Sequence, residues 1–247
     1  MSIPTYLPYY VLASSALIMG ALLLGLCRSL KQTTWASQDK RRTLIVAAAV
    51  LIGWFILSAT LGVLKVYEAV ADGIPTIQYG ILLPILLGGV VIARSSAVGR
   101  VLDAVPLQWL TGVQLYRALG GIFLVLYGAG QLPGLFAWPA GLGDVLVGVL
   151  APVVALAYAR GPGNNGDLVA AWNIFGLLDL IVAVGCGFAT SPSPVQLAAF
   201  DRPNELITAF PLVLIPTYLV PVSVLLHLVS LAKLRRTVRH QGVQLAM

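Results

Sequence analysis

Apolar runs of about 20 residues recur along this chain with few charges inside them, and this pattern limits the fold more than any other feature. A helix of that length spans the hydrocarbon core of a bilayer, which is about 30 Å thick. Only 10% of the residues are charged and 59% are hydrophobic, whereas soluble domains carry about 25% charged residues. We therefore predict an all-α integral membrane protein, a bundle of seven transmembrane helices forming a single domain over residues 1–247. The expected spans are about 5–30, 43–66, 75–95, 109–130, 139–160, 168–189 and 204–234, with a short interfacial segment at 97–108.

The positions of the basic residues predict the orientation of this bundle. Lys and Arg are enriched in the loops on the cytoplasmic side of membrane proteins. If the chain crosses the membrane seven times, all the main basic clusters follow odd-numbered spans and so lie on one side. The loops on the other side of the membrane are mainly acidic. We therefore expect the N-terminus outside, the C-terminus in the cytoplasm, and a plasma membrane of the bacterial inner-membrane type. The basic residues on the expected cytoplasmic side are Arg28, Lys31, Lys40, Arg41, Arg42, Arg94, Arg100, Arg160, Lys233, Arg235, Arg236 and Arg239.

This orientation also accounts for the net charge of +6, so the sequence gives no support for nucleic-acid binding. The expected partner is the lipid bilayer. The basic C-terminal tail at 233–240 is interpreted first as an anchor at the membrane surface, with contact to anionic lipid head groups as the alternative. A homo-oligomer is compatible with the sequence.

Two carboxylates fall inside expected spans, Asp144 in the fifth and Asp179 near the middle of the sixth. An ionised group at the centre of a bilayer costs about 3 kcal/mol on insertion scales, and such residues usually face the interior of the bundle. On a helical wheel, the polar and ionisable residues of spans four to seven share faces with glycine and alanine. Small residues mark helix contacts in membranes, so we expect these polar residues to point inward.

Asp144 has a second interpretation, because a Gly-Asp pair before an apolar run can cap the start of a helix. A helix from Asp144 to Arg160 would rise only about 24 Å, too short for the hydrocarbon core. A start at Pro139 is favoured, and it leaves Asp144 inside the helix. Asp167, after the loop 161–166, is the better candidate for an N-cap, at the start of span six.

The polar residues that face inward form the candidate site. Asp179 and Arg117 are expected to form an internal charge pair or relay, although a buried carboxylate that only fixes helix register is an equally weighted alternative. His227 with Asn173 is a candidate proton-accepting group, against the simpler interpretation of a hydrogen-bonded histidine. The candidate residues that line a cavity are Gln114, Arg117, Asp144, Asn173, Asp179, Glu205 and His227.

Span seven contains three prolines, Pro211, Pro216 and Pro221. Each proline removes a backbone hydrogen bond, which predicts a bent or locally unwound helix and a candidate hinge. The short similarity between residues 141–147 and 176–182, G-L-G-D-V-L-V and G-L-L-D-L-I-V, is interpreted as chance in so apolar a chain.

The sequence lacks the residues that several kinds of metal, cofactor and catalytic site require. The chain has two histidines, too few for a multi-histidine zinc site or a bis-histidine haem. It has no G-x-S-x-G motif and no glycine-rich phosphate loop. We expect no metal and no cofactor.

The two cysteines are placed at opposite membrane faces, too far apart for a disulfide. The plan of seven spans with an outside N-terminus is shared with rhodopsins. A retinal Schiff base would need a lysine deep in span seven, whereas Lys233 lies at the end of that span.

Three functions remain, and whether the protein is an enzyme stays open. The first hypothesis is a carrier or channel-like protein that moves a small polar or protonatable solute, or a proton, through a polar cavity in the bundle. The alternative is a membrane-embedded enzyme acting on a lipid or isoprenoid substrate, with Asp144, Glu205 or His227 as acid or base. A ligand sensor or partner-binding scaffold is the third.

Overall fold

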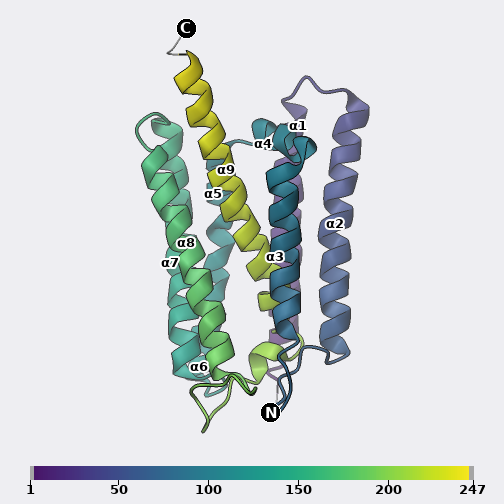
Figure 1. Ribbon diagram of the computed structural model, residues 1–247, viewed down its shortest axis with the longest axis vertical. Helices are drawn as coiled ribbons and strands as arrows, with labels where there is room; N and C mark the ends of the chain where they lie inside the picture. Colours follow the sequence, from purple (N-terminus) through teal and green to yellow (C-terminus); the bar gives the residue numbers. More distant parts are fainter. Residues whose placement is uncertain (1–2, 245–247) are drawn as a thin grey trace.

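The computed structural model describes residues 3–244, and the side chains of residues 3–237. All regular elements in this part of the chain are helical (Figure 1). They are α1 (Leu7–Lys31), α2 (Ser37–Val63), α3 (Ile77–Arg94), α4 (Ser96–Ala104), α5 (Leu107–Gly112), η1 (Val113–Gly121), α6 (Ile122–Gly128), α7 (Gly134–Arg160), α8 (Gly166–Thr190), η2 (Leu206–Thr208), η3 (Ile215–Leu219) and α9 (Val220–Gln244). Seven helical segments are long and apolar enough to cross a membrane. The expected count of apolar helices is confirmed, and it indicates a multi-pass membrane protein.

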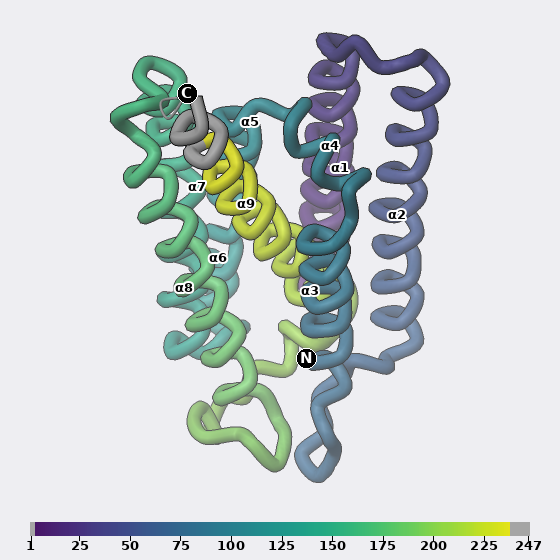
Figure 2. The backbone as a smooth tube through the Cα atoms, turned by 45° about the horizontal axis from the view of Figure 1, so that its top comes forward, coloured from purple at the N-terminus to yellow at the C-terminus, as the bar shows by residue number. Residues whose placement is uncertain are grey.

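The helices run roughly side by side, with the two termini at opposite ends of the bundle (Figures 1 and 2). The α7–α8 hairpin packs against α5, η1 and α6, while α9 crosses the bundle diagonally and contacts α3, α5 and α8. The basic ends of α1, α3 and α7 and the basic half of α9 lie at the same end as the C-terminus. The side chains of Arg239 and His240 lie outside the described residues.

Helix α2 is the least enclosed element. It packs on α1 and η3, yet only 6% of its most apolar 18-residue stretch is buried within the bundle. Side chains such as Val50, Ile56 and Leu57 are more than half exposed. Such an apolar exterior would be unstable in water but is matched to lipid.

The seventh span begins later than expected. Residues 204–214 form the short helix η2 and buried turns, and the spanning segment starts at Ile215 rather than at residue 204. Pro211 contributes to this difference, because it lacks the N–H that a continuous helix would need. Pro211 follows a cis peptide bond in the turns, and Pro216 lies in the first turn of η3, a π-helix. Pro221 lies in the first turn of α9, where proline is tolerated. The expected local unwinding is therefore confirmed, at the start of the span.

The fourth span is not a uniform α-helix. Its central stretch, η1, has 3₁₀ geometry over nine residues, which the sequence did not predict. A 3₁₀ helix has three residues per turn, so side chains at i and i+3 lie directly above one another. Gln114, Arg117 and Gly120 are spaced in this way and therefore share one side of η1.

Two details at the helix starts differ from expectation. Helix α7 begins at Gly134, one turn before Pro139, and Asp144 lies well inside it, as the favoured interpretation required. Helix α8 begins at Gly166, and Asp167 makes no capping bond. The preceding residue Asn165 instead donates its side-chain amide to the carbonyls of Ala157 and Gly161. These two bonds pair carbonyls at the end of α7 and close the α7–α8 turn. The prediction of Asp167 as the N-cap is wrong, because Asp167 lies one residue inside the helix.

Candidate functional site

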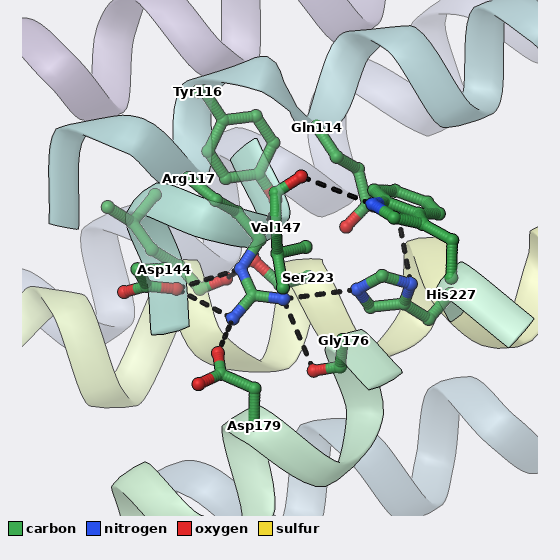
Figure 3. Close-up of polar contacts among 11 residues, drawn as sticks. Gln114, Tyr116, Arg117, Asp144, Val147, Gly176, Asp179, Ser223 and His227 are labelled. Carbon is green, nitrogen blue, oxygen red and sulfur yellow. Dashed lines mark hydrogen bonds and ion pairs between the residues drawn. The ribbon is translucent and has the colours of Figure 1, made fainter. Parts of the chain in front are cut away.

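Arg117 is the centre of a buried polar cluster in the middle of the bundle (Figure 3). Its side chain is 1% exposed. Its Nε donates to Asp144 Oδ1 at 2.8 Å, and one terminal nitrogen lies 2.7 Å from the same oxygen. That nitrogen also donates to Asp179 Oδ2. The other terminal nitrogen donates to the carbonyl of Gly176 and contacts His227 Nε2, both at 3.2 Å. One guanidinium from η1 thus joins α7, α8 and α9.

If both carboxylates in this cluster are ionised, the charges do not cancel. A guanidinium has five N–H donors and is always protonated, and the contacts above engage all five. Both carboxylates bind this single cation, so ionised Asp144 and Asp179 with Arg117 carry a net charge of −1. A carboxylate–guanidinium pair is tolerated in a low dielectric, whereas an extra charge is costly. The cluster therefore favours the binding of one proton or one cation.

His227 is neutral in this arrangement. Its side chain is fully buried, and because arginine can only donate, Nε2 must accept from Arg117. Nδ1 then carries the hydrogen and donates to Asn173 Oδ1 at 2.9 Å. Asn173 in turn donates to Ser230 Oγ at 3.1 Å. The polar contacts thus continue from Arg117 along α8 and α9 towards the end of the bundle that holds the C-terminus.

Glycines make room for these side chains. A Cβ on Gly143 would overlap the Asp179 carboxylate, one on Gly120 would overlap Asp144, and one on Gly176 would overlap the His227 ring. A Cβ on Gly148 would overlap the backbone at Ala118. A methyl group at Gly148 would push η1 away from α7, and one at Gly120 or Gly143 would displace a carboxylate. The glycines of 141–148 and 176 therefore determine how closely α7, α8 and η1 approach.

Two cavities meet at Asp144. The larger, about 60 Å³, extends from the end of the bundle that holds the N-terminus and is lined mainly by apolar residues. The smaller, about 40 Å³, lies between α1, η1 and α9 and is more polar. Tyr116 contacts Ser223 at 2.8 Å in its wall, and Arg117 also lines it. The residues shared by both cavities are Asp144, Leu180, Ile215 and Val220.

Six of the seven residues proposed from the sequence come together here, namely Gln114, Arg117, Asp144, Asn173, Asp179 and His227. The Gln114 amide lies 3.3 Å from His227 Nδ1. Glu205 does not join them: it is exposed in the segment after α8, because the unwound start of the seventh span moves it away from the bundle interior. Of the prolines proposed as a hinge, Pro216 lines the larger cavity.

The sequence reasoning missed Tyr116 and the facing roles of Gly120 and Gly143. For Gly120 the signal was its i, i+3 spacing from Gln114 and Arg117, which becomes meaningful only for a 3₁₀ helix; the sequence carried no such signal for Tyr116 or Gly143. The similarity between 141–147 and 176–182 was interpreted as chance. Asp144 and Asp179, which lie within these two segments, contact the same terminal nitrogen of Arg117. Among the residues that the structure describes, no three His, Cys, Asp or Glu side chains gather as a metal site would require.

Comparison with known proteins gives one match, to a family described as Domain of unknown function (DUF8737), over residues 74–235. No curated protein and no solved structure matches the chain. The matched region contains every residue of the cluster around Arg117, whereas α1 and α2 precede it. Since the match covers more than half of the chain, the protein belongs to the DUF8737 family.

Proposed function

We propose that this protein is a carrier that moves a proton or a small protonatable solute across a membrane, with Arg117, Asp144 and Asp179 as its binding site. One observation carries the proposal: two carboxylates share one arginine whose donors are all engaged, midway along the bundle. The site therefore favours a positive charge over a negative one. Carriers place their coupling groups near the midplane of the bilayer, where ionisable residues are otherwise avoided.

The position of the cluster supports this proposal. Asp144 lines both cavities, so a solute in either one reaches the same carboxylate. The contacts from His227 through Asn173 to Ser230 provide donors and acceptors on the side of the cluster that leads to the C-terminal end. The segment from Pro211 through Pro216 to Pro221, which runs from the buried turns through η3 into α9, would supply the hinge, because it borders the larger cavity.

The orientation belongs to the same proposal. With all basic helix ends at the C-terminal end of the bundle, the positive-inside rule puts the C-terminus in the cytoplasm and the N-terminus outside. The larger cavity would then open outward. A plasma membrane of the bacterial inner-membrane type is the proposed location. The basic tail would contact anionic lipid head groups there.

A flux assay tests the proposal. The full chain is reconstituted in proteoliposomes and a potassium diffusion potential is imposed at pH 6. Two probes are followed: protons, through the change in internal pH, and labelled methylammonium, through its uptake. We expect at least one probe to enter faster than in protein-free liposomes. Asp144→Asn and Asp179→Asn should each reduce that rate about tenfold or more, since each removes the unpaired negative charge.

Glu205→Gln is the matched control, because it neutralises an exposed carboxylate outside the cluster and should leave the rate unchanged. The carrier proposal is overturned if neither probe enters faster than in protein-free liposomes. It is also overturned if Asp179→Asn transports as fast as the Glu205→Gln control.

A membrane-embedded enzyme acting on a lipid or isoprenoid substrate is the second candidate. The apolar lining of the larger cavity favours it, because an apolar chain would fit there with Asp144 as an acid at the inner end. Two other residues considered as its acid or base are less suited: Glu205 is exposed, and Nε2 of His227 is engaged by Arg117. Turnover of a lipid extract by the wild type, absent in Asp144→Asn, would favour the enzyme over the carrier.

A further inference from the structure

The larger cavity is lined mainly by apolar residues and has one charged residue in its wall. Its lining comes mostly from α3, α7, α8 and η3, with single residues or pairs from α6, η2 and α9 and with the loops near Tyr67 and Ser191 at the mouth. Asp144 is the sole charged residue among the described residues that line it. Tyr67 lies outside the spanning helices, and burial raises its pKa, so the phenol stays neutral. The wall thus presents an apolar surface that ends at one carboxylate.

The depth of the cavity follows from helix geometry. Phe136, Ala140 and Asp144 line it from α7 at intervals of four residues, so they share one face of the helix. Eight residues of helix rise about 12 Å. The volume of about 60 Å³ holds on the order of four to six water-sized groups, so the outer carbons of a longer chain would lie at the mouth. The enclosed space therefore fits a short, narrow apolar body.

Asp144 has a free acceptor. Both contacts from Arg117 to Asp144 go to Oδ1, whereas Oδ2 lies against Gly120 and accepts no hydrogen bond from the described residues. Arg117 has no remaining N–H to offer, and with both carboxylates ionised the cluster carries one excess negative charge. A ligand with a carboxylate or phosphate group would meet repulsion here. An alcohol would find an acceptor but would leave the charge uncompensated. An ammonium group supplies both N–H donors and the missing positive charge.

We propose that the larger cavity binds an amine with an apolar chain, its ammonium group on the Asp144 carboxylate and its chain along the shaft between α3, α7 and α8. The inference rests on the proposed carrier function, of which it names the substrate class. It predicts selectivity by charge at one end of the ligand and by size at the other.

Calorimetry tests this with three probes of equal chain length, n-octylamine, n-octanol and n-octanoate, titrated at pH 7 into the full chain in lipid nanodiscs. Empty nanodiscs correct for partition into lipid. We expect octylamine to bind about tenfold or more tightly than octanol, and octanoate not to bind. Asp144→Asn should remove most of the preference for octylamine over octanol, whereas Glu205→Gln should keep it.

A second variant keeps the test decisive if Asp144→Asn fails to fold. Ala183 lines the cavity without belonging to the charged cluster, and Ala183→Leu should weaken octylamine and octanol alike by filling the shaft. The inference is overturned if octylamine and octanol bind equally to the wild type, if octanoate binds as tightly as octylamine, or if Ala183→Leu leaves octylamine binding unchanged.

The outcomes separate this inference from the proposed function. Octylamine binding with the expected selectivity but no flux of either probe in proteoliposomes refutes the carrier and supports the amine site. Proton flux that depends on Asp144, with no octylamine binding, supports the carrier and overturns the amine site.

Discussion

The charge imbalance around Arg117 predicts opposite effects for two neutralising substitutions. Arg117→Met leaves two ionised carboxylates facing each other, a net charge of −2. Asp179→Asn leaves Arg117 paired with Asp144, a net charge of zero, and an amide oxygen can still accept the hydrogen bond. Removing one partner of a buried ion pair costs about 3–5 kcal/mol. Asp179→Asn should change stability by about 1 kcal/mol or less, or increase it, because the excess charge is lost.

These energies translate into melting temperatures. For a chain of this size, 1 kcal/mol corresponds to about 2–4 °C. Arg117→Met should therefore melt roughly 6–20 °C below the wild type, and Asp179→Asn within about 4 °C of it or above it. The triple variant Arg117→Met, Asp144→Asn, Asp179→Asn should recover much of the loss, since no ionised group is left without a partner. Thermal unfolding of the purified variants in one detergent at neutral pH measures all three.

Glu205→Gln is the control and should match the wild type. The reasoning is refuted if Asp179→Asn lowers the melting temperature as much as Arg117→Met does. That result would mean that Asp179 stabilises the fold through its charge, and that the cluster carries no excess negative charge to be removed.

Two further predictions concern packing and orientation. Gly176→Ala should destabilise the protein by about 1–3 kcal/mol, because the new methyl group displaces the His227 ring, whereas Gly89→Ala in α3 meets open space and should be neutral or stabilising; thermal unfolding of both variants measures the difference, and equal effects would contradict the role of Gly176. An alkaline phosphatase fused after Leu197 should be active in a bacterial host and one fused at the C-terminus inactive; the reverse pattern would overturn the orientation.

The sequence predicted the parts of this fold that depend on hydropathy and helical period. Seven apolar helices and the inward direction of Arg117, Asp144 and Asp179 follow from run length and from glycine and alanine on the same faces. The wheel assumed 100° per residue throughout, which fails in η1, where three residues complete a turn. For that reason the alignment of Gln114, Arg117 and Gly120 could not be found from the wheel.

The start of the last span shows a second limit. Residues 204–214 are apolar enough to resemble membrane helix, and hydropathy alone cannot distinguish a helix from buried turns. Their backbone is arranged by tertiary contacts: Leu206, Leu212 and Leu214 pack into a core cluster with α1 and α7. Glu205 was placed in the cavity because that part of the chain was taken as helical. Such long-range packing cannot be predicted from the local sequence.

The π-helix η3 has a consequence for the wall between the two cavities. Ile215 and Val220 bound both cavities, and the turns that contain them hold one residue more than an α-helix would. Converting a π-turn into an α-turn shifts the register by one residue and rotates the side chains beyond it by about 100°. Such a rotation would change which side chains of α9 face the two cavities, and would therefore alter the shapes of both cavities together.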